Sequence, residues 1–311
     1  MAYSDRMQKN HLYTVFFAPR GLNRIADLGM QIAQQYLSPF DKLIGLVGSA
    51  GAGKSMLIKG MFPGLELTND DAGVNVRPLP LLGIADSDTG FYTPHTYHVD
   101  IRFEAAFTQM HELASMIKEA MMRGKRVVVE HFELVYPYLN QNAHLLIGIG
   151  EEVIITRPTL FGPEPQDIAN IVFKSLPYRL MTHTAEDLCS YLMQEQGCDS
   201  NYLHADVRHG FILSFLKKPD LDLNLLERRV NEAIAQDIPV SYKDDHHIMI
   251  GDKLWGCSGP RFHVKSTKDI KRFTLSKELF LEPITERYLL VGVVGEFGEQ
   301  RISDLNKIYS T

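Results

Sequence analysis

The chain has 311 residues, a net charge of −6 and 45% apolar residues. This length and apolar content suit a globular protein of about two domains, and the acidic balance argues against a protein that coats nucleic acid with its whole surface. Three scattered cysteines cannot form a disulfide framework, which favours a reducing compartment. Because the chain has no apolar signal core and no run of about 20 apolar residues, we expect a cytoplasmic protein without a membrane partner.

The first half alternates predicted helices and strands. Helices are expected at Leu22–Tyr36, from about Lys54, and at Phe103–Met121, where a stripe of Phe and Met side chains should face the core. Strands are expected at Leu43–Val47, Leu81–Ala85, Val127–Val129, Leu145–Ile149 and Val153–Thr156. This alternation predicts an α/β domain with a parallel sheet and helices around it.

Between the strand at Leu43–Val47 and the next helix, the sequence matches the phosphate-loop motif G-x-x-x-x-G-K-S/T, known as Walker A. The residues are Gly48, Ser49, Ala50, Gly51, Ala52, Gly53, Lys54 and Ser55. Glycines let successive backbone N–H groups face phosphate oxygens, and the following helix adds its positive N-terminal end. Lys54 is expected to contact the β- and γ-phosphates and Ser55 to ligate magnesium. The motif therefore predicts a site for a nucleoside triphosphate, most naturally ATP with Mg²⁺; the alternative is a glycine-rich turn without a ligand.

A carboxylate at the end of a neighbouring strand usually completes such a site. Glu130 ends the predicted strand after Gly124, whereas Asp86 and Asp88 follow the strand predicted at Leu81–Ala85. We expect Glu130 on the magnesium side, and Asp86 at a substrate hydroxyl or a metal. The alternative for each is an ordinary carboxylate in a turn.

Gly124–Glu130 resembles the Gly-Lys turn and Val-rich strand with a terminal acid of small-molecule P-loop kinases, the uridine kinase and phosphoribulokinase group. Asp86–Tyr92 is similar to the stretch where those kinases hold their substrate. The resemblance implies a P-loop NTPase fold and a kinase-like phosphotransferase or NTPase with a small-molecule substrate. No arginine-rich lid is recognisable, and Arg157 is the best single candidate for its role.

The pattern changes after about Pro177. We expect a P-loop domain at 1–176, a smaller domain at 177–285, and a C-terminal strand and tail at 286–311. Within the second domain, helices are predicted at Ala185–Met193 and Leu223–Ile234 and a strand at His209–Leu216. Seven Lys or Arg residues crowd the segment Lys253–Lys277.

Four segments of the second half resemble, in order, the second additional domain shared by alanyl- and threonyl-tRNA synthetases and free-standing editing proteins. They are a helix start at Thr182–Leu188, a strand segment at Leu203–Phe215, a helix and strand at Leu226–Val240, and Cys257–Val264. The resemblance implies an α+β editing-type domain with zinc held by His183, Asp187, Cys257 and His263. Asp187 replaces a family histidine, and five residues instead of three separate Cys257 from His263. A set of one Cys, two His and one Asp is chemically coherent for zinc.

Simpler interpretations exist for the same residues. Thr184 and Asp187 fit a helix capping box, Cys257 suits a small buried residue, and His263 suits a histidine in a strand. Cys189 and Cys198 are expected to be structural. Alternative metal ligands, whose spacing supports no specific set, are His204, His209, His246 and His247.

Three functions follow as hypotheses. The first is an ATP-dependent phosphotransferase or NTPase fused to the editing-type domain. The second is a stand-alone zinc-dependent hydrolase of mischarged aminoacyl-tRNA, in which the Lys253–Lys277 cluster would contact phosphates. A solvated basic face explains that cluster equally well. The third is a non-catalytic, nucleotide-dependent binding module.

Overall fold

The computed structural model describes residues 13–67, 95–198, 201–295 and 305–306. The chain forms two compact units, Met1–Lys174 and Ser175–Thr311. The division falls within helix α8 (Pro165–Glu195), two residues before the boundary predicted at 176/177. The predicted strand Leu81–Ala85 lies outside the described residues. Among the helices that are described, none has the length and apolar character needed to span a membrane.

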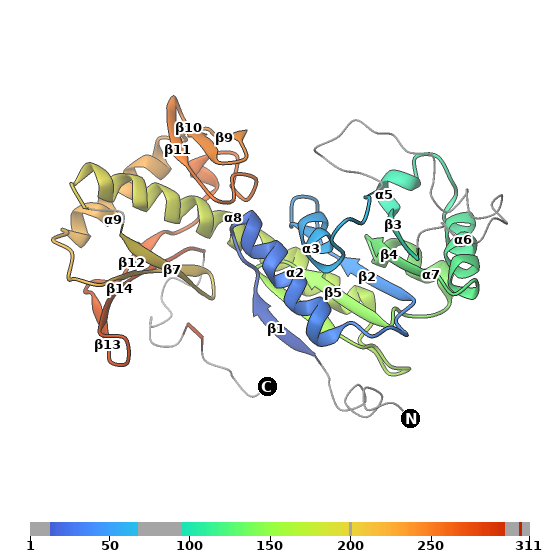
Figure 1. The fold of residues 1–311 in the computed structure, drawn as a ribbon. Coiled ribbons are helices and arrows are strands. Elements are labelled where there is room, and N and C mark those ends of the chain that lie inside the picture. Colours follow the sequence, from blue (N-terminus) through green and yellow to red (C-terminus); the bar gives the residue numbers. More distant parts are fainter. Residues whose placement is uncertain (1–12, 68–94, 199–200, 296–304, 307–311) are drawn as a thin grey trace. The chain divides into compact units, whose positions relative to one another are not determined.

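The first unit is built on a six-stranded sheet with the order β1-β6-β5-β2-β4-β3 in the described part of the chain (Figure 1). Its strands are β1 (Thr14–Phe17), β2 (Leu43–Val47), β3 (Thr96–Asp100), β4 (Arg126–Glu130), β5 (Leu145–Ile149) and β6 (Glu152–Thr156). The four strands β3, β4, β2 and β5 are parallel, whereas β6 and β1 are antiparallel to their neighbours. The α/β prediction is therefore confirmed, but the sheet is mixed. The connection from β5 to β6 is too short for the crossover that a parallel pair requires.

Helices surround this sheet and carry its connections. They are α2 (Leu22–Tyr36), α3 (Lys54–Met61), α5 (Ile101–Glu104), α6 (Met110–Met122), α7 (Phe132–Leu139) and the first part of α8. Helices α2 and α3 touch backbone to backbone: a Cβ atom at Gly29 would lie 2.3 Å from the carbonyl oxygen of Leu57, and one at Gly60 2.0 Å from that of Ala26. Glycine at both positions permits this approach, which holds α3 and the loop before it in place.

The single helix predicted at Phe103–Met121 is wrong, because the structure has two helices there. Asp100 caps α5, its Oδ1 accepting from the backbone N–H groups of Arg102 (2.9 Å) and Phe103 (3.3 Å). Helix α6 then begins at a second cap formed by Gln109 and Glu112. Two local caps thus interrupt a periodic apolar pattern. Phe107, predicted to face the core, lies between the two helices and is exposed.

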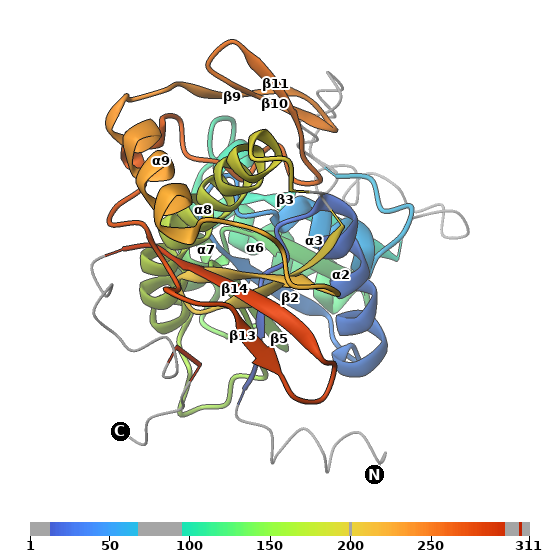
Figure 2. The same ribbon diagram turned by 90° about the vertical axis from the view of Figure 1, so that its left-hand side faces the viewer.

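In its described residues, the second unit contains antiparallel sheets, the later part of α8, a second α-helix and a 3-10 helix at Thr267–Asp269. One sheet has the order β12-β14-β8-β7, with β13 beside β14, and the other has the order β11-β10-β9. Its strands are β7 (Tyr202–Val207), β8 (Gly210–Phe215), β9 (Val240–Asp244), β10 (His247–Ile250), β11 (Lys253–Gly256), β12 (Thr274–Leu275), β13 (Phe280–Glu282) and β14 (Arg287–Val293). Helix α9 (Leu223–Ala235) and the later part of α8 lie on one face of the larger sheet (Figure 2).

Three expectations for this unit are corrected. Leu203–Phe215 is not one strand but the hairpin of β7 and β8, turned at His209 with a positive φ of 56°. The strand expected within 286–311 is present as β14, but it pairs with β8 and so belongs to the larger sheet of the second unit instead of a separate C-terminal segment. No helix starts at Thr182–Leu188, because α8 runs from Pro165 to Glu195 with Pro177 inside it.

Candidate phosphate loop and candidate metal centre

The loop at residues 48–55 joins the buried strand β2 to α3. Gly51 and Gly53 have positive φ angles of 77° and 93°, a conformation that glycine adopts without steric cost. Lys54, 5% exposed, folds back over the loop, and its Nζ donates to the carbonyl oxygens of Gly48 and Ser49, both at 3.1 Å. The curled loop and its lysine are therefore part of one local structure.

Glu130 lies beside this loop because β4 is the parallel neighbour of β2, with Leu46 paired to Glu130. The Ser55 hydroxyl donates to Glu130 Oε1 at 3.0 Å, and Lys54 Nζ lies 3.6 Å from Oε2. His98 Nε2 on β3 lies 3.1 Å from Oε1. Burial by itself would raise the pKa of Glu130, but contact with His98 and Lys54 and the Ser55 hydrogen bond lower it to about 2. Glu130 is therefore an anion at neutral pH.

The structure adds Asp100 and His131 to this edge of the sheet, which the sequence analysis missed. Asp100 ends β3 and is paired with Glu130 in the parallel register, and His131 follows Glu130 directly. One ligand atom each from Asp100, Glu130 and His131 lie within 4.8 Å of one another. The sequence did contain a signal for Asp100. Thr96–Asp100 is a short strand-like run that ends in an acid, just before the long helix predicted at Phe103–Met121.

Other predicted residues of the first unit do not join this group. Asp86 and Asp88 lie outside the described residues. Arg157, the lid candidate, instead connects distant segments of the first unit. Its guanidinium donates to both carboxylate oxygens of Asp41, at 2.7 and 2.8 Å, and to the carbonyl oxygens of Tyr36 and His144. A bidentate pair of this kind holds the guanidinium in one orientation. The prediction of Arg157 as a lid residue is therefore wrong.

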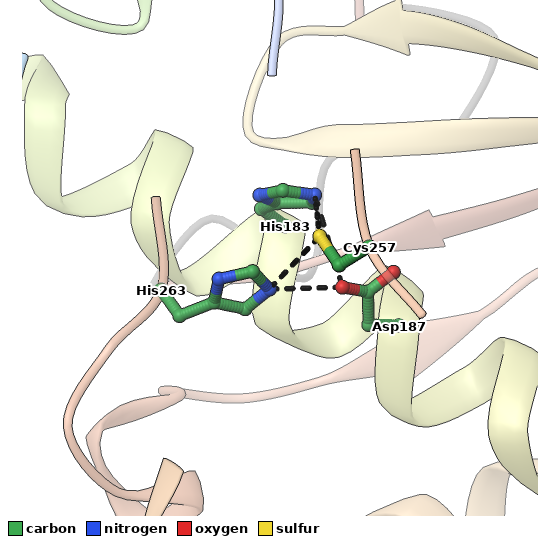
Figure 3. A group of neighbouring side chains, drawn as sticks. All are labelled: His183, Asp187, Cys257 and His263. Atoms are coloured by element: carbon green, nitrogen blue, oxygen red, sulfur yellow. Dashed lines mark hydrogen bonds and ion pairs between the residues drawn. The ribbon is translucent and has the colours of Figure 1, made fainter. Parts of the chain in front are cut away.

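In the second unit the four predicted metal ligands point toward one another (Figure 3). His183 and Asp187 lie one turn apart on α8, and Cys257 and His263 belong to the segment after β11. His183 Nε2 is 3.5 Å from Cys257 Sγ and 3.8 Å from Asp187 Oδ2. His263 Nε2 is 3.8 Å from Cys257 Sγ and 2.8 Å from Asp187 Oδ2. Four donors that span 80 residues of sequence thus meet in one place.

These distances fit a tetrahedral metal. Ligand bonds of zinc of about 2.1 Å place neighbouring donor atoms about 3.4 Å apart, and three of the four distances are 3.5–3.8 Å. His183 Nδ1 lies 3.2 Å from the carbonyl oxygen of Phe262. Because a carbonyl can only accept, Nδ1 carries the proton, and Nε2 presents its lone pair to the centre. The donor set and the carbonyl partner of His183 suit Zn²⁺, whereas His263 Nδ1 is buried and has no hydrogen-bond partner in the described structure.

The charges in this cluster are opposed and close. Burial by itself would raise the pKa of Asp187, but His183 and His263 lower it to about 2. Burial and the nearby Asp187 carboxylate both raise the pKa of the Cys257 thiol. A cation bound here would lower the pKa of the Cys257 thiol, opposing both burial and the Asp187 carboxylate, because metal binding favours the thiolate.

Of the simpler interpretations of these residues, the capping box does not hold, whereas Cys257 is indeed buried in the core of this unit. Thr184 and Asp187 do not form an N-terminal cap, since both lie inside α8, where the Thr184 hydroxyl donates to the carbonyl oxygen of Leu180 at 2.9 Å. The alternative histidines have other contacts: His204 Nδ1 lies 2.7 Å from Glu186, His247 Nδ1 lies 2.8 Å from Asp244, and His209 stacks on Tyr178.

The remaining cysteines of this unit pack in or against its core, and several residues of its basic segment form ion pairs within the protein. Cys189 is fully buried in the core of the second unit, against which Cys198 packs. In the segment Lys253–Lys277, three lysines are ion-paired within the protein. These pairs are Lys253 with Glu195, Lys268 with Asp237 and Lys277 with Glu227. Part of this positive charge is thus neutralised by the protein itself.

Comparison with known proteins does not assign the chain to a family. No protein-family model and no curated protein matches it. Among solved structures, an aminotransferase from Eubacterium rectale is similar at 10% sequence identity and a TM-score of 0.24, over 76% of this chain and 68% of that one. A similarity this low carries no argument about fold or function.

Proposed function

We propose that the first unit binds a magnesium nucleoside triphosphate, most naturally ATP, at Gly48–Ser55 and acts as a phosphotransferase or NTPase. The observation that carries this proposal is the 3.0 Å hydrogen bond between Ser55 and Glu130. A hydroxyl at the start of the helix after the loop and a carboxylate at the end of the adjacent strand are the two protein groups that hold magnesium in P-loop NTPases. Here they meet although 75 residues separate them.

Each residue then has a defined role. The loop glycines and the N-terminus of α3 present backbone N–H groups to the phosphates. Lys54, which contacts the carbonyl oxygens of Gly48 and Ser49 and the carboxylate of Glu130, would exchange these partners for phosphate oxygens. Ser55 and the anionic Glu130 would hold magnesium, which would neutralise charge on the phosphates.

Lys54→Ala tests nucleotide binding. Loss of a charge-assisted contact should weaken ATP binding by about 10–150-fold, or ~1.5–3 kcal/mol. Calorimetry with ATP and Mg²⁺ measures the change. Lys59→Ala is the matched control, because it removes a lysine in the last turn of the same helix. This variant should bind ATP as the wild type does. Equal affinities for folded Lys54→Ala and wild type would refute the nucleotide site.

Glu130→Gln tests the reaction. The variant keeps the shape of the side chain but removes its charge, so turnover of ATP should fall much more than nucleotide affinity. A protein that binds ATP and has no turnover in either form would instead be the nucleotide-dependent binding module. In that case Glu130 has no role in phosphate transfer.

The four converging donors of the second unit favour a second candidate function. We propose that His183, Asp187, Cys257 and His263 hold zinc and that this unit hydrolyses the ester bond of mischarged aminoacyl-tRNA. Bound zinc would supply Lewis-acid activation of a water or an anchor for the substrate. The ion pairs of Lys253, Lys268 and Lys277 weigh against extensive phosphate contacts on that surface.

Deacylation of a panel of mischarged tRNAs tests this second function directly. Hydrolysis by the zinc-loaded wild type that is lost in Cys257→Ser would support it. Zinc binding without hydrolysis of any tRNA in the panel would leave a structural metal centre and contradict the editing function.

A further inference from the structure

Asp100, Glu130 and His131 form a compact donor group at the C-terminal ends of β3 and β4. One ligand atom from each lies within 4.8 Å of the others. Parallel pairing places Asp100 directly beside Glu130, and the three residues are no more than 9% exposed. The cap of α5 uses only Oδ1 of Asp100. The backbone therefore brings two carboxylates and one imidazole together out of bulk water.

His131 is held in an unusual conformation at this point. It has a φ of 58°, in the left-handed region that residues other than glycine rarely adopt, and it precedes the first turn of α7. Its Nδ1 is buried and makes no hydrogen bond in the described structure, but lies 3.5 Å from Glu133 Oε1. A carboxylate behind the ring of a histidine is the usual second shell of a metal ligand.

Buried negative charge exceeds positive charge in this region. Glu104 is fully buried, and in the described structure neither of its carboxylate oxygens has a hydrogen-bond partner. Burial, together with the charge of Asp100, raises the pKa of Glu104 to about 7. Glu130 is paired with Lys54 and His98, whereas in the described structure no cationic side chain is paired with Asp100 or Glu104. Burying a carboxylate without a counter-charge is costly, so a bound cation would stabilise this group.

We propose that Asp100, Glu130 and His131 bind a divalent transition-metal ion, in addition to the magnesium ion of the nucleotide. A mixed set of imidazole and carboxylate ligands suits Mn²⁺, Fe²⁺ or Zn²⁺, whereas Mg²⁺ prefers oxygen ligands and retains water. An ammonium or guanidinium group would neutralise the negative charge, but it would not be coordinated by the imidazole of His131. The site shares Glu130 with the proposed nucleotide site but needs no nucleotide, so the two proposals can fail independently.

Manganese binding to the full chain without nucleotide is the test. Electron paramagnetic resonance of free Mn²⁺ gives the affinity, and the electron spin echo of bound Mn²⁺ detects coupling to an imidazole nitrogen. Wild type and Lys54→Ala should both bind with nitrogen coupling. Asp100→Asn should bind at least 10-fold more weakly, and His131→Gln should lose the nitrogen coupling.

The zinc cluster of the second unit supplies the matched control, because it also contains imidazoles. His263→Gln should keep the nitrogen-coupled Mn²⁺ signal. Glu133 acts as a positioning residue for His131. The variant Glu133→Gln should therefore bind Mn²⁺ about 10–100-fold more weakly than the wild type, and Glu133→Asp, which keeps the carboxylate, should recover affinity. Nitrogen coupling that persists in His131→Gln and disappears in His263→Gln would overturn the proposal, as would equal Mn²⁺ affinity in wild type and Asp100→Asn.

Discussion

The proposed phosphate loop of the first unit and the proposed metal centre of the second unit are built in opposite ways. Eight consecutive residues, 48–55, form the loop, and its lysine is satisfied mainly by carbonyl oxygens of the same loop. The proposed metal centre joins two positions on α8 to Cys257 and His263, which lie 70 to 80 residues further along the chain. A contiguous site depends on local backbone geometry, whereas a discontinuous site exists only if the whole unit folds.

The two regions also differ in their charge balance. In the metal centre the single carboxylate, Asp187, contacts two histidines. At the edge of the first sheet, Glu130 contacts Lys54 and His98, but the buried Glu104 carboxylate has no hydrogen-bond partner in the described structure. Every carboxylate of the first cluster therefore has a partner of opposite charge available, whereas Asp100 and Glu104 of the second have none among the described residues.

Removing a ligand of the metal centre should have the largest effect. Cys257→Ser should abolish stoichiometric zinc in protein purified without chelator, and zinc should no longer raise its unfolding free energy. Zinc at about 1,000 times its Kd contributes ~4 kcal/mol to a protein that binds it only when folded. Metal analysis and urea unfolding with and without zinc measure both effects. Cys198→Ser, which removes a cysteine outside the cluster, should keep its zinc; a wild type that neither contains nor takes up zinc would disprove the centre.

Glu104→Gln should change how stability depends on pH. Because the folded-state pKa of Glu104 is raised to about 7, its stabilising contribution is complete below the unfolded value near 4.5 and is lost as pH rises through 7. The loss amounts to about 3 kcal/mol by pH 8. Denaturation between pH 5 and 8 with chelator present should show this decline in wild type and a flatter curve in Glu104→Gln. Parallel curves would mean that the carboxyl has an ordinary pKa.

Gly60→Ala tests whether even the contiguous loop depends on tertiary packing. The added methyl group would lie 2.0 Å from the carbonyl oxygen of Ala26, so α2 and α3 must move apart. Overpacking of this kind costs about 1–3 kcal/mol, and the shift of α3 should also weaken ATP binding. Gln34→Ala, an exposed change on α2, is the control for thermal unfolding and calorimetry. Unchanged stability of Gly60→Ala would contradict the backbone contact.

Asp222→Ala should have the smallest effect, because it removes one local contact of the second unit. Asp222 caps α9 by accepting from the backbone N–H of Leu225 at 2.9 Å. Loss of such a cap costs about 1 kcal/mol, without any loss of zinc. Urea unfolding compares it with Asp220→Ala, an exposed neighbour outside the cap. If Asp222→Ala released zinc, the metal centre would depend on α9 far more than its geometry indicates.

Local patterns in the sequence were enough to predict several elements of the fold. Leu22–Tyr36, Leu43–Val47 and Leu145–Ile149 have the predicted bounds, because apolar periodicity and flanking turn residues mark them within a few positions. The loop glycines, Lys54 and Ser55 were identifiable for the same reason, as their spacing along the chain is also their arrangement in space.

The features that sequence reasoning missed depend on contacts between distant segments. The cap at Asp100 breaks a helix whose apolar period is continuous, and α8 runs without a break through Thr182–Leu188, where a new helix was expected to start. Strand order places Asp100 and His131 beside Glu130, and no local pattern specifies strand order. The four zinc candidates were recognisable only through a family resemblance. The distances between them, and the contact of His183 with the carbonyl oxygen of Phe262, arise when α8 packs against the segment after β11. That packing forms only when the whole unit folds.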